Sequence, residues 1–197
     1  RKIVEGTKRT KEKVSILEAI KDEAWDFISF QQASHLSGIY STYERYVTPL
    51  LEYVKDNNKN DHTQYVFHQT CAYSGDSGHD GFRYYNNNQE RMYENIVKAT
   101  DRTSDETELK IVVPSGTAIQ NARTSFVGDN FCRDGYHLDF AIGRYTASCT
   151  WAKALLGLDV LNSSYIPKQL TSSEMLVARL SAHYAVIQPL GVTPLNY

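Results

Sequence analysis

Apolar residues along this chain follow two spacings, one typical of helices and one typical of strands. Within residues 11–23, Val14, Leu17 and Ile20 recur every three residues between lysines and glutamates, as on the buried face of a helix. Short runs rich in β-branched and aromatic residues separate such segments and predict strands. The predicted helices cover residues 11–23, 42–55, 88–100, 117–123, 140–156 and 173–187, and the predicted strands cover residues 27–32, 64–69 and 109–113.

The ends of several helices carry capping residues. Ser115 follows Pro114 and is predicted to cap the helix over residues 117–123. Ser172 or Ser173 is predicted to open the last helix. Gly157 is predicted to end the helix over residues 140–156, because glycine adopts the left-handed conformation common at helix ends.

Strands alternate with helices in this order, which is typical of right-handed βαβ units. The sequence therefore predicts an α/β fold, a three-layer α/β/α sandwich around a parallel sheet, as a single domain over residues 1–197. Functional groups in such sheets lie in loops past the carboxyl ends of the strands. We therefore look for the site in residues 31–38, 68–80 and 114–137.

Composition narrows the class of protein. Apolar residues make up 41% of the chain and the formal net charge is −2, so neither a basic nucleic-acid surface nor a membrane-binding charge pattern is present. No apolar run approaches the ~18 residues that a membrane span needs. The six histidines show no metal-ligand spacing, and we expect neither a metal nor an organic cofactor.

The cysteines and the first residues bear on localisation. The three cysteines leave at least one thiol without a partner in the chain, and a disulfide between Cys132 and Cys149 would be compatible with an exported protein. The sequence opens at Arg1 rather than at a methionine, as in an exported protein that has lost its leader or a chain with earlier residues absent. We expect a periplasmic or secreted protein.

The motif with the clearest chemistry is Asp134-Gly135-Tyr136-His137. A carboxylate three residues before a histidine can hold the imidazole Nδ1 and leave Nε2 free to take a proton from a nucleophile. The alternative is structural, with Asp134 capping a helix and His137 lying on the surface. The motif alone leaves both interpretations open.

Polar residues also follow the first two predicted strands. The amides of Gln31 and Gln32 could donate hydrogen bonds to a developing oxyanion, or they could merely close the end of the strand. Ser34 follows in the same loop. His35 is next to it in sequence, but this alone does not make the two residues a catalytic pair. His68 ends the second strand, where it could line the cleft or be a buried structural histidine.

Four segments together resemble one family. They are WDFISFQQASHLSG (residues 25–38), YVFHQTCAY (residues 65–73), VPSGTAIQNAR (residues 113–123) and CRDGYHL (residues 132–138), the last followed by Gly143-Arg144-Tyr145 and Trp151. In order and spacing they are similar to blocks of an uncharacterised bacterial branch of the SGNH (GDSL-type) hydrolases. The resemblance spans roughly residues 10–165.

The resemblance implies a flavodoxin-like SGNH hydrolase fold and a role for each site residue. Asp134 and His137 would supply two members of a Ser-His-Asp triad. Gln32, with Gln31 in reserve, would replace the family's usual oxyanion-hole asparagine. The family's first block, a strand followed by Gly-Asn-Ser or Gly-Asp-Ser, is not found here, so we expect the first strands and the nucleophile in a preceding N-terminal segment of the same protein. Ser34 and Ser115 are not assigned that role.

The implied activity is ester hydrolysis, with removal of O-acetyl groups from carbohydrate as the expected reaction and a small-molecule or glycan ester as the partner. Aromatic residues near the predicted cleft suit sugar rings, and we name Tyr40, Tyr43, Tyr73 and Tyr84. The competing class is a non-catalytic glycan-binding module on the same scaffold. A metal-dependent phosphoesterase is a third alternative, for which only the loop around Asp134 offers carboxylates and histidine together.

Overall fold

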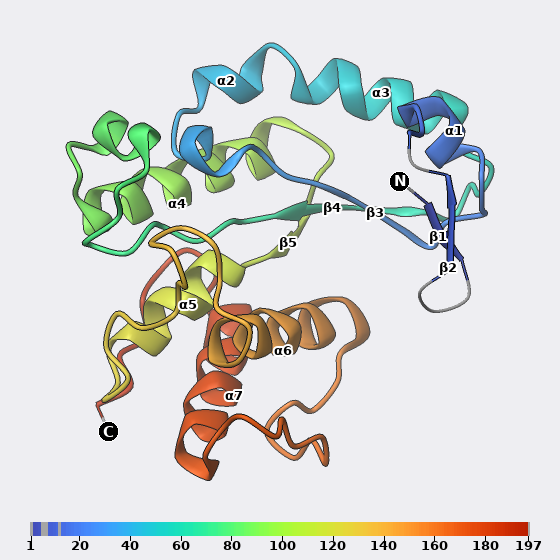
Figure 1. Cartoon of the computed structure of the whole chain (residues 1–197). Helices are drawn as coiled ribbons and strands as arrows, with labels where there is room; N and C mark the ends of the chain where they lie inside the picture. The colour runs from blue at the N-terminus through green and yellow to red at the C-terminus, as the bar shows by residue number, and fades with distance from the viewer. Residues whose placement is uncertain (1, 5–7, 12, 197) are drawn as a thin grey trace.

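A parallel sheet of three strands lies at the centre of the molecule (Figure 1). The computed structural model describes residues 2–4, 8–11 and 13–196. The strands are β3 (Phe27–Phe30), β4 (Gln64–His68) and β5 (Ile111–Val113), in the spatial order β3-β4-β5. Phe30 pairs with Phe67 and His68 pairs with Val113, so the carboxyl ends of all three strands share one edge. The predicted α/β fold with a parallel sheet is confirmed.

Helices cover both faces of this sheet. Figure 1 shows helices above and below the sheet. The upper layer holds α1 (Ile16–Ile20), α2 (Ser41–Glu44), α3 (Val47–Asn57) and α4 (Gln89–Glu106), and the lower layer holds α5 (Ser115–Arg123), α6 (Ile142–Leu156) and α7 (Ser172–Ile187). Two short 3-10 helices, Ser34–Leu36 and Asp80–Tyr85, follow β3 and β4. This arrangement is compatible with a sandwich.

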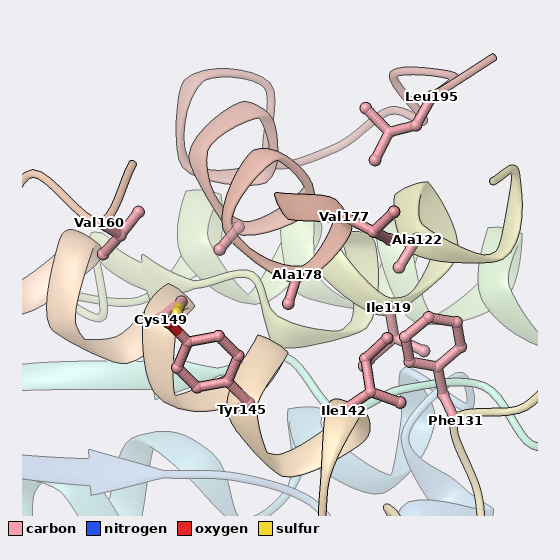
Figure 2. Close-up of a cluster of buried hydrophobic side chains, with 11 residues drawn as sticks. Ile119, Ala122, Phe131, Ile142, Tyr145, Cys149, Val160, Val177, Ala178 and Leu195 are labelled. Carbon is pink, nitrogen blue, oxygen red and sulfur yellow. The ribbon is translucent and has the colours of Figure 1, made fainter. Parts of the chain in front are cut away.

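Each layer has its own apolar core. Above the sheet, Leu51 and Val54 of α3 pack with Phe30 and Phe67 of the strands. Below it, the three lower helices bury a cluster against one another (Figure 2). The members of that lower cluster are Ile119, Ala122, Phe131, Ile142, Tyr145, Cys149, Val160, Val177, Ala178, Ala182 and Leu195. Burial of this apolar surface holds the helices in place, and the helices in turn position the loops at the carboxyl edge of the sheet.

Two helices begin at capping boxes that the periodicity did not indicate. Ser15 accepts a hydrogen bond from the backbone N–H of Glu18, whose carboxylate accepts from the Ser15 backbone, and α1 begins there rather than at residue 11. Thr171 and Glu174 form the same pair at α7, so Thr171 and not Ser172 or Ser173 is the cap. The predicted Gly157 cap of α6 is confirmed, with φ +63°.

Three other predictions need correction. The helix predicted over residues 42–55 is divided into α2 and α3, because Pro49 has no N–H to donate and its ring would meet the carbonyl of Arg45. Ser115 is the first residue of α5, after Pro114 at the cap position, and its hydroxyl caps nothing. Two short strands precede α1, β1 (Lys2–Val4) and β2 (Lys8–Lys11), and they pair antiparallel. They were not predicted, because their sequences show no strand alternation.

The outer edge of β3 is open among the described residues. The three strands are contiguous, with β3 at one edge and β5 at the other. Ser29, in the middle of β3, is exposed to solvent. The backbone groups of an edge strand can pair with a further strand. Separately, none of the described helices is both long and apolar enough to cross a membrane.

Candidate active site

Asp134 and His137 lie in the loop between α5 and α6, and their side chains are joined. The Nδ1–H of His137 donates to Asp134 Oδ2 at 2.8 Å. The other carboxylate oxygen, Oδ1, accepts from the backbone N–H of His137 at 2.8 Å and from that of Tyr136 at 3.3 Å. The motif therefore closes on itself, so that the carboxylate holds both the backbone and the ring of the same histidine.

These bonds determine the charge of the carboxylate. The backbone N–H of His137, and then its imidazole, lower the pKa of Asp134 to about 2. Asp134 is therefore ionised at neutral pH and accepts the Nδ1 proton. That tautomer leaves Nε2 of His137 with a free lone pair. The His137 side chain is 53% exposed, and no described residue hydrogen-bonds Nε2. The ring can thus take a proton from an incoming group.

Backbone contacts hold this loop in place. The N–H of Arg133 donates to the His137 carbonyl at 2.9 Å, and Cys132 forms a single antiparallel bridge with Leu138. The N–H of Ser74 donates to the Gly135 carbonyl at 2.8 Å, which places the loop against the segment that follows β4. Gly135 has φ +85°, and a Cβ there would lie 2.9 Å from Ser77 Cα. Only glycine fits this turn without strain.

A second histidine, His68, lies at the end of β4. Its Nδ1–H donates to Gln31 Oε1 at 2.7 Å, which joins the ends of β3 and β4. Its ring packs on Trp151 of α6, with 4.9 Å between ring centroids. Burial lowers the pKa of His68 to about 4, and its Nε2 is buried without a described partner. His68 is therefore neutral at pH 7, and it orients Gln31.

The two glutamines differ in what their amides do. The Gln32 amide nitrogen donates to Thr42 Oγ1 at 3.0 Å and to the Thr42 carbonyl at 3.3 Å, while its oxygen accepts from the backbone of Ala33. The Gln31 oxygen faces His68, and the amide nitrogen of Gln31 donates to no described residue. Both residues border a small cleft of about 180 Å³ between β3 and the α2–α3 segment.

Ser34 is connected to the Asp134–His137 loop through aromatic rings. Its hydroxyl shares a hydrogen bond of 2.9 Å with Tyr73. The Tyr73 ring lies 5.8 Å from that of Tyr136, which lies 4.2 Å from the His137 imidazole. His79 completes the group, 4.7 Å from Tyr136. Loops after β3 and β4 and the loop before α6 thus meet here, whereas no contact joins the Gln31–His68 pair to His137 directly.

Two members of this group were not assigned to the site from the sequence. Tyr136 stands inside the Asp134–His137 motif, and its position beside His137 could have indicated a contact. His79 is partly buried between Tyr73 and Tyr136, and its Nδ1 accepts from Gly81 N–H. The expected aromatics Tyr40 and Tyr43 are not part of this group and stack together at α2, where Tyr43 borders the small cleft of Gln31 and Gln32.

No disulfide is formed in this structure, where Cys71, Cys132 and Cys149 are all free thiols. Cys149 is buried in α6, whereas Cys132 lies in the loop that carries Asp134, beside Cys71. The possible bond between Cys132 and Cys149 is thus not formed here.

Comparisons with known proteins give one family. A family model described as "Domain of unknown function (DUF4886)" matches residues 1–185. The crystal structure of a DUF4886 family protein from Bacteroides uniformis ATCC 8492 is similar at 45% sequence identity with a TM-score of 0.89, over 92% of this chain and 70% of that one. A search of curated proteins found no match.

Proposed function

The chain belongs to the DUF4886 family, and for this chain we propose the function of an SGNH-type serine esterase that removes O-acetyl groups from carbohydrate. The observation that carries the proposal is the Asp134–His137 pair, with the imidazole held at Nδ1 by an ionised carboxylate and its Nε2 open. A histidine in this state is a general base for a hydroxyl nucleophile. The SGNH resemblance supplies the rest of the mechanism.

In the proposed reaction, a serine hydroxyl attacks the acyl carbon while Nε2 of His137 takes its proton. Asp134 stabilises the imidazolium that results. His137 then gives the proton to the leaving sugar alkoxide, which departs as the alcohol. A water molecule, deprotonated by the same Nε2, attacks the acyl-serine and releases the acid. Every proton is passed through one ring, so the orientation of that ring governs the rate.

We assign the nucleophile to a segment of the same protein outside these 197 residues. No described serine hydrogen-bonds His137, and Ser34 is bound to Tyr73 instead. The outer edge of β3 offers unpaired backbone groups to a further parallel strand. Such a strand would end at the same carboxyl edge as β3, where a Gly-Asn-Ser or Gly-Asp-Ser turn would deliver its serine. The proposal includes the finer fold assignment, an SGNH hydrolase sheet extended beyond β3.

For the oxyanion hole we propose Gln31 first and Gln32 second. His68 holds the Gln31 oxygen, which directs the amide N–H groups of Gln31 away from His68. The Gln32 amide is already bound to Thr42 and would have to turn. A preorganised donor stabilises the oxyanion better than one that must reorient. His68 is thus a positioning residue.

The aromatic group around His137 supports a carbohydrate substrate. Tyr136 lies beside the His137 imidazole, and His79 packs against Tyr136. Tyr84 is 48% exposed, with its ring 6.4 Å from that of His35. Aromatic faces pack on the apolar faces of sugar rings. The same surface would serve the competing function, a glycan-binding module without catalysis.

The test is to measure hydrolysis of p-nitrophenyl acetate by the full-length protein and its His137→Ala variant. We expect kcat to fall by roughly 10³-fold or more, because general-base catalysis and triad organisation are lost together. His62→Ala is the matched control, since His62 is exposed and its side chain makes no described contact. Unchanged activity in folded His137→Ala would refute the mechanism.

The substrate class needs a second assay. We expect acetate release from an O-acetylated oligosaccharide, measured enzymatically, to depend on His137 as the p-nitrophenyl ester does. A folded protein that binds the oligosaccharide in calorimetry but hydrolyses neither ester would support the glycan-binding module instead.

A further inference from the structure

Two thiols meet beneath the loop that carries Asp134 and His137. Cys71 lies shortly after the end of β4, and Cys132 lies two residues before Asp134. Both are partly buried and free. Arg123 Nη2 contacts Cys132 Sγ and also the carbonyl of Ala72, the neighbour of Cys71. The two segments also touch where Ser74 N–H donates to the Gly135 carbonyl at 2.8 Å. The two cysteines therefore lie in neighbouring segments on one guanidinium.

A buried cation stands beside this pair. The Arg123 side chain is only 4% exposed, and its Nη2 donates to Cys132 Sγ at 3.9 Å and to the Ala72 carbonyl at 3.2 Å. Its Nε forms an ion pair with Asp129 Oδ1 at 2.7 Å. A buried guanidinium favours negative charge nearby, and a thiolate at Cys132 supplies it.

The two thiols are consequently unlike each other. The neighbouring Cys71 thiol, followed by the charge of Arg123, lowers the pKa of Cys132 to about 6, although burial and Asp129 oppose this. The neighbouring Cys132 and burial raise the pKa of Cys71. Near pH 7 the pair is thus a thiolate with a thiol beside it. In contrast, Cys149 lies apart in α6, and burial raises its pKa.

We propose that Cys71 and Cys132 are a redox pair, in which a disulfide between them fastens the loop of Asp134 and His137 to the segment after β4. Cys132 is the attacking sulfur and Cys71 the resolving one. The inference stands on the thiol cluster and does not depend on the esterase proposal. It also gives the chain a specific site of oxidation, with Cys149 left as a thiol.

The oxidant in this reaction is a small-molecule disulfide. The Cys132 thiolate attacks one of its sulfurs and expels a thiolate, which leaves a mixed disulfide on Cys132. Cys71 loses its proton, and its sulfur attacks the Cys132 sulfur and expels the second thiolate. One external disulfide is reduced to two thiols, while the two cysteines together lose two electrons and two protons.

Peptide mapping tests the pairing directly. The full-length protein is equilibrated with oxidised glutathione, alkylated under denaturing conditions and digested with trypsin. Arg83, Arg123, Arg133 and Arg144 separate the three cysteines into different peptides. We expect a crosslink of the Cys71 and Cys132 peptides, reversed by dithiothreitol, with Cys149 alkylated. Alkylation of both Cys71 and Cys132 after oxidation, or a crosslink to Cys149, would overturn the proposal.

Two further measurements need no catalytic activity. The alkylation rate of Cys132 in the folded, reduced protein should be half-maximal near pH 6, and Cys71→Ser should move that midpoint upward. Oxidation should raise Tm by about 5–15 °C, because the disulfide closes a long loop in the unfolded chain. Cys149→Ser is the control, which should keep both effects. A midpoint above pH 8 in the wild type, or an unchanged Tm, would contradict the account.

Discussion

Two histidines at the carboxyl edge of the sheet, His137 and His68, make the same kind of hydrogen bond but differ in exposure, in the charge of the partner and in access to Nε2. In each histidine, Nδ1–H donates a hydrogen bond to a side-chain oxygen. His137 donates to Asp134 Oδ2 at 2.8 Å, and His68 donates to Gln31 Oε1 at 2.7 Å. His137 is half-exposed, its partner is charged, and its Nε2 is open. His68 packs against Trp151, its partner is neutral, and its Nε2 is buried.

The difference shows that a hydrogen bond at Nδ1 does not by itself make a histidine a base. An ionised partner stabilises the imidazolium that proton uptake creates, whereas a neutral amide does so much less. Burial opposes that charge as well and lowers the pKa of His68 to about 4. We therefore propose that His137 transfers the proton and that His68 positions Gln31. Four substitutions test this division.

The largest effect is expected from Asp134→Asn. Asparagine would present an N–H to Nδ1 and favour the tautomer with a proton on Nε2, which cannot accept one from serine. We expect kcat for p-nitrophenyl acetate to fall by roughly 10³-fold while the fold is kept, as measured by steady-state kinetics and circular dichroism. Asp61→Asn, in an exposed loop, is the control. If Asp134→Asn kept wild-type kcat, Asp134 would be no more than a turn-forming residue.

An intermediate effect is expected from Gln31→Ala. Loss of one oxyanion donor lowers kcat by about 10²-fold in known cases, with KM little changed. Gln32→Ala should cost less than tenfold, because that amide serves Thr42. Kinetics of the two variants side by side decide between the glutamines. A larger loss in Gln32→Ala would reverse their assignment.

The smallest effect concerns stability and His68. Because the folded-state pKa of His68 is about 4 and the unfolded value is near 6.5, the unfolded chain binds more protons between these values. Stability from His68 is therefore complete above about pH 7 and is lost as the pH falls toward 4. The loss amounts to about 2 kcal/mol between pH 7 and pH 5.

Urea unfolding at the two pH values measures this contribution. The His68→Asn variant should show a smaller fall in the free energy of unfolding between pH 7 and pH 5 than the wild type. His62→Ala, which changes an exposed histidine, should match the wild type. Equal pH dependence in wild type and His68→Asn would show that His68 is not held neutral by burial.

The same contrast explains how much could be predicted from the sequence. Asp134 and His137 are three residues apart, and their contact is a local turn, so the motif predicted it. The three strands of the parallel sheet were also predicted, because each is a short apolar run. The capping boxes at Ser15 and Thr171 are local as well and have the S/T-x-x-E pattern in the sequence.

What the sequence did not predict depends on packing between distant segments. The burial of His68 requires Trp151 of α6, and the choice between Gln31 and Gln32 requires His68 and Thr42. Cys71 and Cys132 meet only because the loop before α6 folds onto the segment after β4. Periodicity and spacing contain no information on such encounters.

The central claim is that His137 activates a serine, and covalent labelling tests it most directly. A fluorophosphonate reacts with an activated serine and leaves a phosphonyl group that peptide mass spectrometry locates. The account predicts one labelled serine in the full-length wild type, lying in a Gly-Asn-Ser or Gly-Asp-Ser sequence outside these 197 residues, and at least tenfold slower labelling in His137→Ala. Labelling of a serine within the 197 residues, no labelling at all, or equal rates in wild type and His137→Ala would contradict it.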